Sequence, residues 1–166
     1  MLLPYFCNMQ PLHQSIIETW QIHNRSMLMF VKELPEKALD ATLSKRGGRD
    51  IARQLAHCIS VRIFRLQTTM KKTGIQLNDF DKEYSPTRDE LLQAFEVSSE
   101  LMESLIAEAL QNDGNVSNFK RGVVPMIGYY ITHEAHHKGH ALLTMKTCGI
   151  PIPDSLKWGI WEWNKI

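Results

Sequence analysis

The sequence has almost no excess of charge of one sign. Its 166 residues carry 19 Lys and Arg against 18 Asp and Glu, a formal net charge of +1. Proteins that bind nucleic acid usually present a clustered basic surface, so this balance argues against a nucleic-acid partner. The sequence also lacks a run of the roughly 18 apolar residues that a membrane-spanning helix needs. We therefore expect neither a nucleic acid nor a membrane as partner.

Cysteine is scarce as well. Cys7, Cys58 and Cys148 lie far apart and form no CxxC pair. Three separated cysteines fit free thiols in a reducing compartment better than a disulfide framework, and we expect Cys58 to be a small core residue. The N-terminal segment has no basic region, and Pro4 interrupts its short apolar run, unlike a secretory signal. These features predict a cytoplasmic protein.

No segment shows the period-two alternation of a β-strand. Four segments instead repeat apolar residues at helical spacing. Their expected bounds are Leu12 to Leu34 before Pro35, Asp50 to about Thr73, a start at Thr87 or at Ser85-Pro86 running to Gln111, and Val123 to Cys148-Gly149.

These segments predict an all-α protein, a four-helix bundle formed by a single domain over residues 1–166. An up-down-up-down order is the natural arrangement, although the connections at 35–49 and 74–86 are long enough to cross over. The Ser-Lys-Arg-Gly-Gly loop at 44–48 lacks the GxxxxGK[ST] pattern of a phosphate loop, so a plain turn is expected. The aromatic tail, 157–166, contains three tryptophans and is expected to pack on the bundle or on a second subunit.

Four of the seven histidines fall within eight positions, at 133, 136, 137 and 140. At about 100° per residue, His133 and His137 lie one turn apart and point partly inward. His136 is expected to face solvent, and His140 lies at the edge of the apolar stripe. Two imidazoles at positions i and i+4 can converge on one metal ion, so the spacing favours a metal site.

Two helical histidines cannot complete such a site, so a third ligand must come from another helix. His23 on the first helix and His57 on the second are the candidates. Periodicity slightly favours His23, because it lies on the main apolar stripe of its helix, and does not decide between them.

The segment 133–137 is also a literal HExxH, the zinc-protease motif in which the glutamate acts as general base. Glu162 could supply the downstream glutamate ligand of such an enzyme. The absence of strand patterns argues against this function, since zinc proteases use a sheet to bind peptide. Glu134 is expected to be a surface charge beside the stripe rather than a base.

The segment Thr132-His-Glu-Ala-His-His-Lys-Gly-His140 is followed by Cys148-Gly-Ile-Pro-Ile-Pro. Together these motifs resemble the fourth helix of DinB-like proteins (the DinB/YfiT group), whose usual form is close to Asn-His-x-x-His-His-Arg-Gly-Gln. Lys138 replaces the usual Arg and His140 the usual Gln, with the spacing kept. Gln54-Leu-Ala-His57 resembles the family's Leu-x-His segment, and residues 158–163 resemble its aromatic end.

This resemblance implies a four-helix bundle, often a homodimer, that holds a divalent ion on His57, His133 and His137. Zinc or nickel is expected, with iron as a further candidate. Three histidines leave coordination positions open, as in a catalytic site. The resemblance implies a small-molecule substrate such as a low-molecular-weight thiol, with S-transfer or hydrolysis as the reaction. A non-catalytic dimeric bundle is the first alternative, and an HExxH protease is the second.

Overall fold

The computed structural model describes residues 11–44, 46, 48–69 and 79–166. The bounds of its helical elements are α1 Pro11–Glu33, η2 Glu36–Ala38, α2 Ile51–Thr69, α3 Arg88–Gln111, α4 Val123–Thr147, α5 Asp154–Lys157 and η3 Gly159–Trp161. Within these described ranges there is no strand, only an isolated bridge between Val116 and Phe119. The all-α bundle predicted from the periodicity is confirmed.

Local capping explains where the helices begin. An Asp50 carboxylate oxygen accepts a hydrogen bond from the Arg53 amide at 2.7 Å, as an N-cap residue does. At the start of α3, Thr87 and Glu90 form a reciprocal capping box, which decides between the two predicted starts. The predicted end of the second helix, Thr73, lies outside the described residues.

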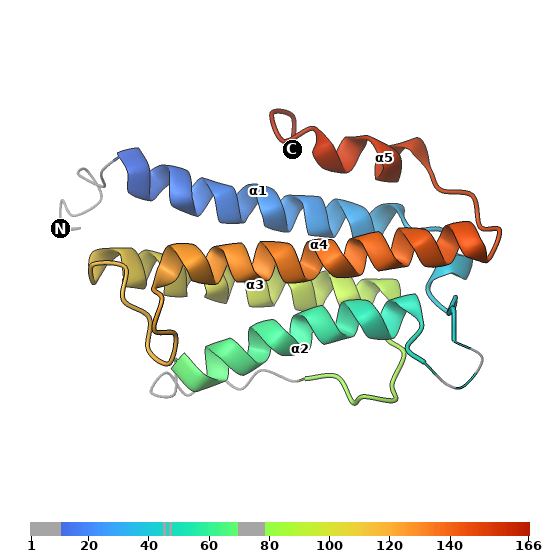
Figure 1. The fold of residues 1–166 in the computed structure, drawn as a ribbon, viewed down its shortest axis with the longest axis horizontal. Coiled ribbons are helices and arrows are strands. Elements are labelled where there is room, and N and C mark those ends of the chain that lie inside the picture. The colour runs from blue at the N-terminus through green and yellow to red at the C-terminus, as the bar shows by residue number, and fades with distance from the viewer. Residues whose placement is uncertain (1–10, 45, 47, 70–78) are drawn as a thin grey trace.

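The order of the helices differs from the up-down-up-down prediction. Figure 1 shows α1 and α4 running in one direction and α2 and α3 in the other, so the order is up-down-down-up. Helices α1 and α2 lie on opposite sides of the bundle, and each packs against both α3 and α4. The reason is the long connection before α3, whose described part returns along α2. In that part, Asp79 accepts a hydrogen bond from Ser60 of α2, and Glu83 accepts one from Arg53 of α2.

The core consists of two apolar clusters, one toward each end of the bundle. One contains Phe30, Ile59 and Phe95, and the other contains Trp20, Met102 and Tyr130. Between them, each long helix contributes buried polar side chains. These form a polar layer made of His23, Asn24, Ser26, Arg62, Ser98, Ser99 and Glu134. Burying this layer is favourable only if its groups are hydrogen-bonded to one another.

The aromatic tail packs on α1, and this bears out the first of its two expected positions. Ile160 is its buried anchor, and Leu156, directly before the tail, is buried as well. Trp158 and Trp161 do not anchor the tail, since their side chains are 69% and 72% exposed. None of the described helices is long and apolar enough to span a membrane.

Truncating the tail at its anchor is expected to cost much more stability than truncating it at a tryptophan. Ile160→Ala should lower the free energy of unfolding by about 2–4 kcal/mol, because it leaves a cavity against α1. Trp161→Ala should change it by less than about 0.5 kcal/mol, as for an exposed surface residue. Urea denaturation measures both, and equal losses would contradict this packing.

Candidate metal centre

Three histidines from two helices meet at one place. His57 lies on α2, and His133 and His137 lie one turn apart on α4. One ring nitrogen from each lies within 4.8 Å of the other two, and all three side chains are half-buried. The ring centroids are 4.7 Å apart for His133 and His137, and 5.3 and 5.2 Å from these to His57. Imidazoles in this arrangement can share one ion with little movement.

Two of these rings have an unsatisfied nitrogen. The Nδ1 atoms of His133 and His137 are buried and have no hydrogen-bond partner in the described part of the chain. A buried polar atom without a partner costs free energy, so the pair fits a site completed by a bound group. The donor set, three imidazoles, suits a divalent transition-metal ion.

The surroundings also keep the three rings neutral, the form that binds a metal. Burial lowers the pKa of His137 to about 4, assisted by the neighbouring His133 and His57 rings. Burial and the Arg49 charge lower the pKa of His57, and burial lowers that of His133. Near neutral pH each ring therefore offers a nitrogen lone pair with no proton to displace.

His23, the alternative third ligand, lies elsewhere. Its side chain is buried in the polar layer, and its Nε2 atom donates a hydrogen bond to the Glu134 carboxylate at 2.8 Å. Burial lowers the pKa of His23, so the ring is neutral and acts as a donor to the carboxylate. The periodicity that slightly favoured His23 identified a core residue, and His57 is the histidine that joins the pair on α4.

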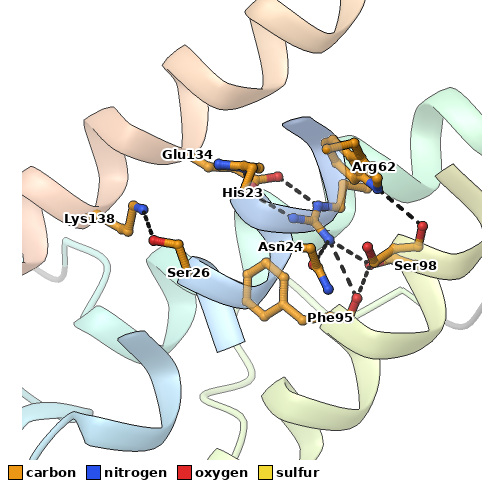
Figure 2. A network of polar contacts seen from close by, with 10 residues as sticks. His23, Asn24, Ser26, Arg62, Phe95, Ser98, Glu134 and Lys138 are labelled. Atoms are coloured by element: carbon orange, nitrogen blue, oxygen red, sulfur yellow. Dashed lines mark hydrogen bonds and ion pairs between the residues drawn. The ribbon is translucent and has the colours of Figure 1, made fainter. Parts of the chain in front are cut away.

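The prediction that Glu134 is a surface charge is wrong. Its side chain is fully buried and accepts two hydrogen bonds from Arg62, at 2.6 Å from Nε and 2.7 Å from Nη2 (Figure 2). Burial alone would raise the pKa of Glu134, but the Arg62 guanidinium and the His23 hydrogen bond hold it at about 2. The carboxylate is thus ionised and satisfied inside the bundle.

Arg62 binds all three of the other long helices. Besides Glu134 on α4, its Nη1 atom donates to Asn24 on α1 at 3.0 Å and to Ser98 on α3 at 3.4 Å (Figure 2). The guanidinium carbon also lies 4.8 Å from the centre of the Trp20 ring and 4.9 Å from that of Phe95, within cation–π range. The buried charge is thereby paired, hydrogen-bonded and stacked.

This network removes the basis for the protease alternative. In an HExxH enzyme the glutamate must face the metal-bound water as general base. Here both Glu134 oxygens are occupied by Arg62 and His23, on a face of α4 different from that of His133 and His137. The described residues also contain no sheet that could hold a peptide.

The remaining histidines of the cluster lie nearer the surface. His136 is exposed, as the helical angle predicted. His140 is also exposed, and its Nδ1 atom is 2.6 Å from Oε1 of Gln54. Cys58 is buried, as predicted, and burial raises the pKa of its thiol well above the ordinary value. Cys148 is exposed, and Cys7 lies outside the described residues.

Arg62 is the residue that the sequence prediction missed. It lies between Ile59 and Ile63 on the buried face of α2, and it is fully buried. An arginine inside an apolar stripe is a signal that a carboxylate faces it, since a lone buried charge is strongly unfavourable. Lys138, which stands where the resemblance expects Arg, donates to Ser26 at 3.1 Å at the edge of the same layer (Figure 2).

A comparison with protein-family models decides the family. The model of the DinB superfamily matches residues 19–141, which include the three clustered histidines and the whole polar layer. The chain belongs to the DinB superfamily. No curated protein and no solved structure matches it. In this DinB-superfamily protein the match ends before the aromatic tail.

Removing the arginine of the polar layer is expected to be strongly destabilising. Arg62→Met leaves the Glu134 carboxylate buried without its cation, which should cost about 3–5 kcal/mol of unfolding free energy. The matched control is Arg53→Gln on the same helix, whose partner Glu83 is exposed, and it should cost less than about 1 kcal/mol. Chemical denaturation compares the two, and similar losses would argue against a central ion pair.

Acid is expected to destabilise the metal-free protein in two stages. The pKa values of His23, His57, His133 and His137 lie below the ordinary 6.5, so below about pH 6.5 the unfolded chain takes up protons more readily than the native one. The pKa of Glu134, about 2 against an ordinary 4.5, adds a second loss between those values. Urea midpoints should therefore fall from pH 7 to pH 3, and constant or rising midpoints would contradict these shifts.

Proposed function

We propose that this protein binds one divalent metal ion through His57, His133 and His137 and uses it in an enzymatic reaction on a small molecule. The observation that carries the proposal is the convergence of three ring nitrogens within 4.8 Å of one another. Their low proton affinity and the unpartnered Nδ1 atoms of His133 and His137 support it.

An open position for a substrate supports catalysis over a closed structural site. Three protein ligands leave room in the coordination shell of a divalent ion. A cavity of about 580 Å³ adjoins the cluster, and His137 forms part of its wall. That volume suits a small molecule. A bound divalent ion would supply a Lewis acid that lowers the pKa of a coordinated water or thiol.

The residues of this chain have distinct tasks in such a reaction. The three histidines hold the ion and remain unprotonated near neutral pH. Glu134, one residue after His133, fixes α4 against Arg62 and His23, so it orients the ligand-bearing helix and exchanges no proton. Thiol S-transfer or hydrolysis through a bound thiolate or water is the class of reaction that this arrangement favours, with a low-molecular-weight thiol as a candidate substrate.

The identity of the metal is a further part of the proposal. Zinc and nickel both accept three imidazoles, and iron is a third candidate.

A homodimer also stays a proposal, supported by Trp158 and Trp161, whose large apolar rings are exposed. A bundle that binds metal without turnover is the alternative function.

Metal analysis tests the centre directly. The untagged protein should bind about one equivalent of zinc or nickel, and the bound metal should raise its melting temperature, because an ion that binds only the native state stabilises it. His57→Ala, His133→Ala and His137→Ala should each lose the bound metal or weaken its affinity at least about tenfold. His136→Ala changes a histidine of the same helix that is not one of the three proposed ligands, and this matched control should retain the metal.

Two outcomes would contradict the proposal. Full metal occupancy in all three single variants would show that the ion binds elsewhere, and loss of metal only in His23→Ala would place the third ligand on α1. With the centre established, a screen of thiols with electrophilic acceptors, run beside hydrolase substrates, tests catalysis. No turnover by the metal-loaded protein across this screen would favour the non-catalytic alternative.

A further inference from the structure

The cavity beside the histidine cluster has a one-sided charge. Its charged and titratable lining consists of Arg49 and the rings of His136, His137 and His140, and no Asp or Glu contributes to it. The remaining lining is mainly polar, with Thr42, Ser44 and Gln54 among it. This lining favours anions, because its one permanent charge is the positive guanidinium of Arg49, an exposed residue that attracts negative charge.

Arg49 has no carboxylate partner among the described residues. Arg53, Arg62 and Arg88 each pair with a glutamate. No ion pair of Arg49 occurs within the described ranges, and positions 1–10, 45, 47 and 70–78 contain no Asp or Glu that could supply one. Arg49 nevertheless lies close to the three clustered histidines, since it lines one cavity together with His137 and a second cavity together with His57.

The loop before α2 is built to hold Arg49 at this place. The Thr42 hydroxyl donates to the Arg49 carbonyl at 3.3 Å and accepts a hydrogen bond from the Ser44 amide at 3.1 Å, which closes the loop. Gly48 packs so closely on Ser44 that a Cβ at position 48 would collide with that side chain. Ser44 and Gly48, the two ends of the segment expected to be a plain turn, therefore line the cavity.

Helix α2 offers the cavity a second hydrogen-bond donor. Gln54 is almost fully buried, and its Oε1 atom is 2.6 Å from Nδ1 of His140. Because an amide oxygen only accepts, the His140 Nδ1 atom donates, and this bond fixes the orientation of both side chains. The Gln54 amide nitrogen has no partner among the hydrogen bonds of the described residues, so it can donate to a group inside the cavity.

We propose that this cavity selects substrates that carry a carboxylate, with Arg49 as the residue that binds it and Gln54 as an additional donor. A guanidinium matches the two oxygens of a carboxylate with a pair of parallel hydrogen bonds. The other end of such a molecule extends toward His137, at the cluster. This inference rests on the proposed function for the identity of the reacting end, while the carboxylate site itself stands on the cavity.

The first test uses the metal-free protein, so that it does not depend on the metal centre. Propionate and its neutral isostere propionamide are titrated at pH 7.5, and the amide signals of Gly48 and His140 are followed by NMR. Propionate should give saturable shifts with an affinity at least about tenfold above that for propionamide. Arg49→Gln should abolish the difference, and Arg49→Lys should retain part of it.

Arg46→Gln is the matched control, because it removes one positive charge from the same loop and Arg46 does not line the cavity. It should leave the preference for propionate unchanged. Equal binding of propionate and propionamide by the native protein would overturn the inference. So would a preference that survives in Arg49→Gln or that Arg46→Gln removes to the same extent.

The second test joins the carboxylate site to the metal. Cobalt-loaded protein is titrated with 3-mercaptopropionate and with 2-mercaptoethanol, which share a thiol and differ in the carboxylate, and thiolate-to-cobalt absorption is recorded. Tighter binding of 3-mercaptopropionate, lost in Arg49→Gln, is the expected result. If cobalt does not bind, the proposed function fails and the first test still decides the carboxylate site. If both thiols bind equally, the metal function stands and the carboxylate inference is wrong.

Discussion

The buried ion pair between Arg62 and Glu134 is the interaction on which the rest of the structure depends. It joins α2 to α4, and the same guanidinium reaches Asn24 on α1 and Ser98 on α3. Two apolar clusters pack on either side of this layer. Apolar surfaces tolerate small shifts in register, but a shift of one helix by a turn would leave a charge buried without its partner. The pair thus fixes how α2 and α4 face each other.

The geometry of the three-histidine cluster depends on this pair. His57 precedes Arg62 on α2, and His133 adjoins Glu134 on α4, so the contact that aligns the charges also brings the imidazoles together. The glutamate of the HExxH segment is bound by Arg62 and His23, so it aligns the two helices. The neighbouring cavity is formed separately, by residues of the loop before α2, by Gln54 and by His136, His137 and His140.

Much of the fold follows from short-range patterns in the sequence. The capping box at Thr87 and the inward angle of His133 and His137 are properties of single helices, and both are confirmed. The burial of Glu134 was not predictable in this way, because its partner is 72 residues away and its helical angle lies at the edge of the stripe. The choice of His57 over His23 likewise depends on which helices are neighbours, and here only the family resemblance indicated it.

The up-down-down-up order has a consequence for the folding pathway. His57 on α2 lies 76 and 80 positions before His133 and His137 on α4, with the whole of α3 between them, so the three-histidine cluster is made of long-range contacts. Contacts of high sequence separation carry a large loop-closure entropy and form late. An ion bound by all three imidazoles would therefore stabilise a bundle that is already assembled and would not direct its early folding.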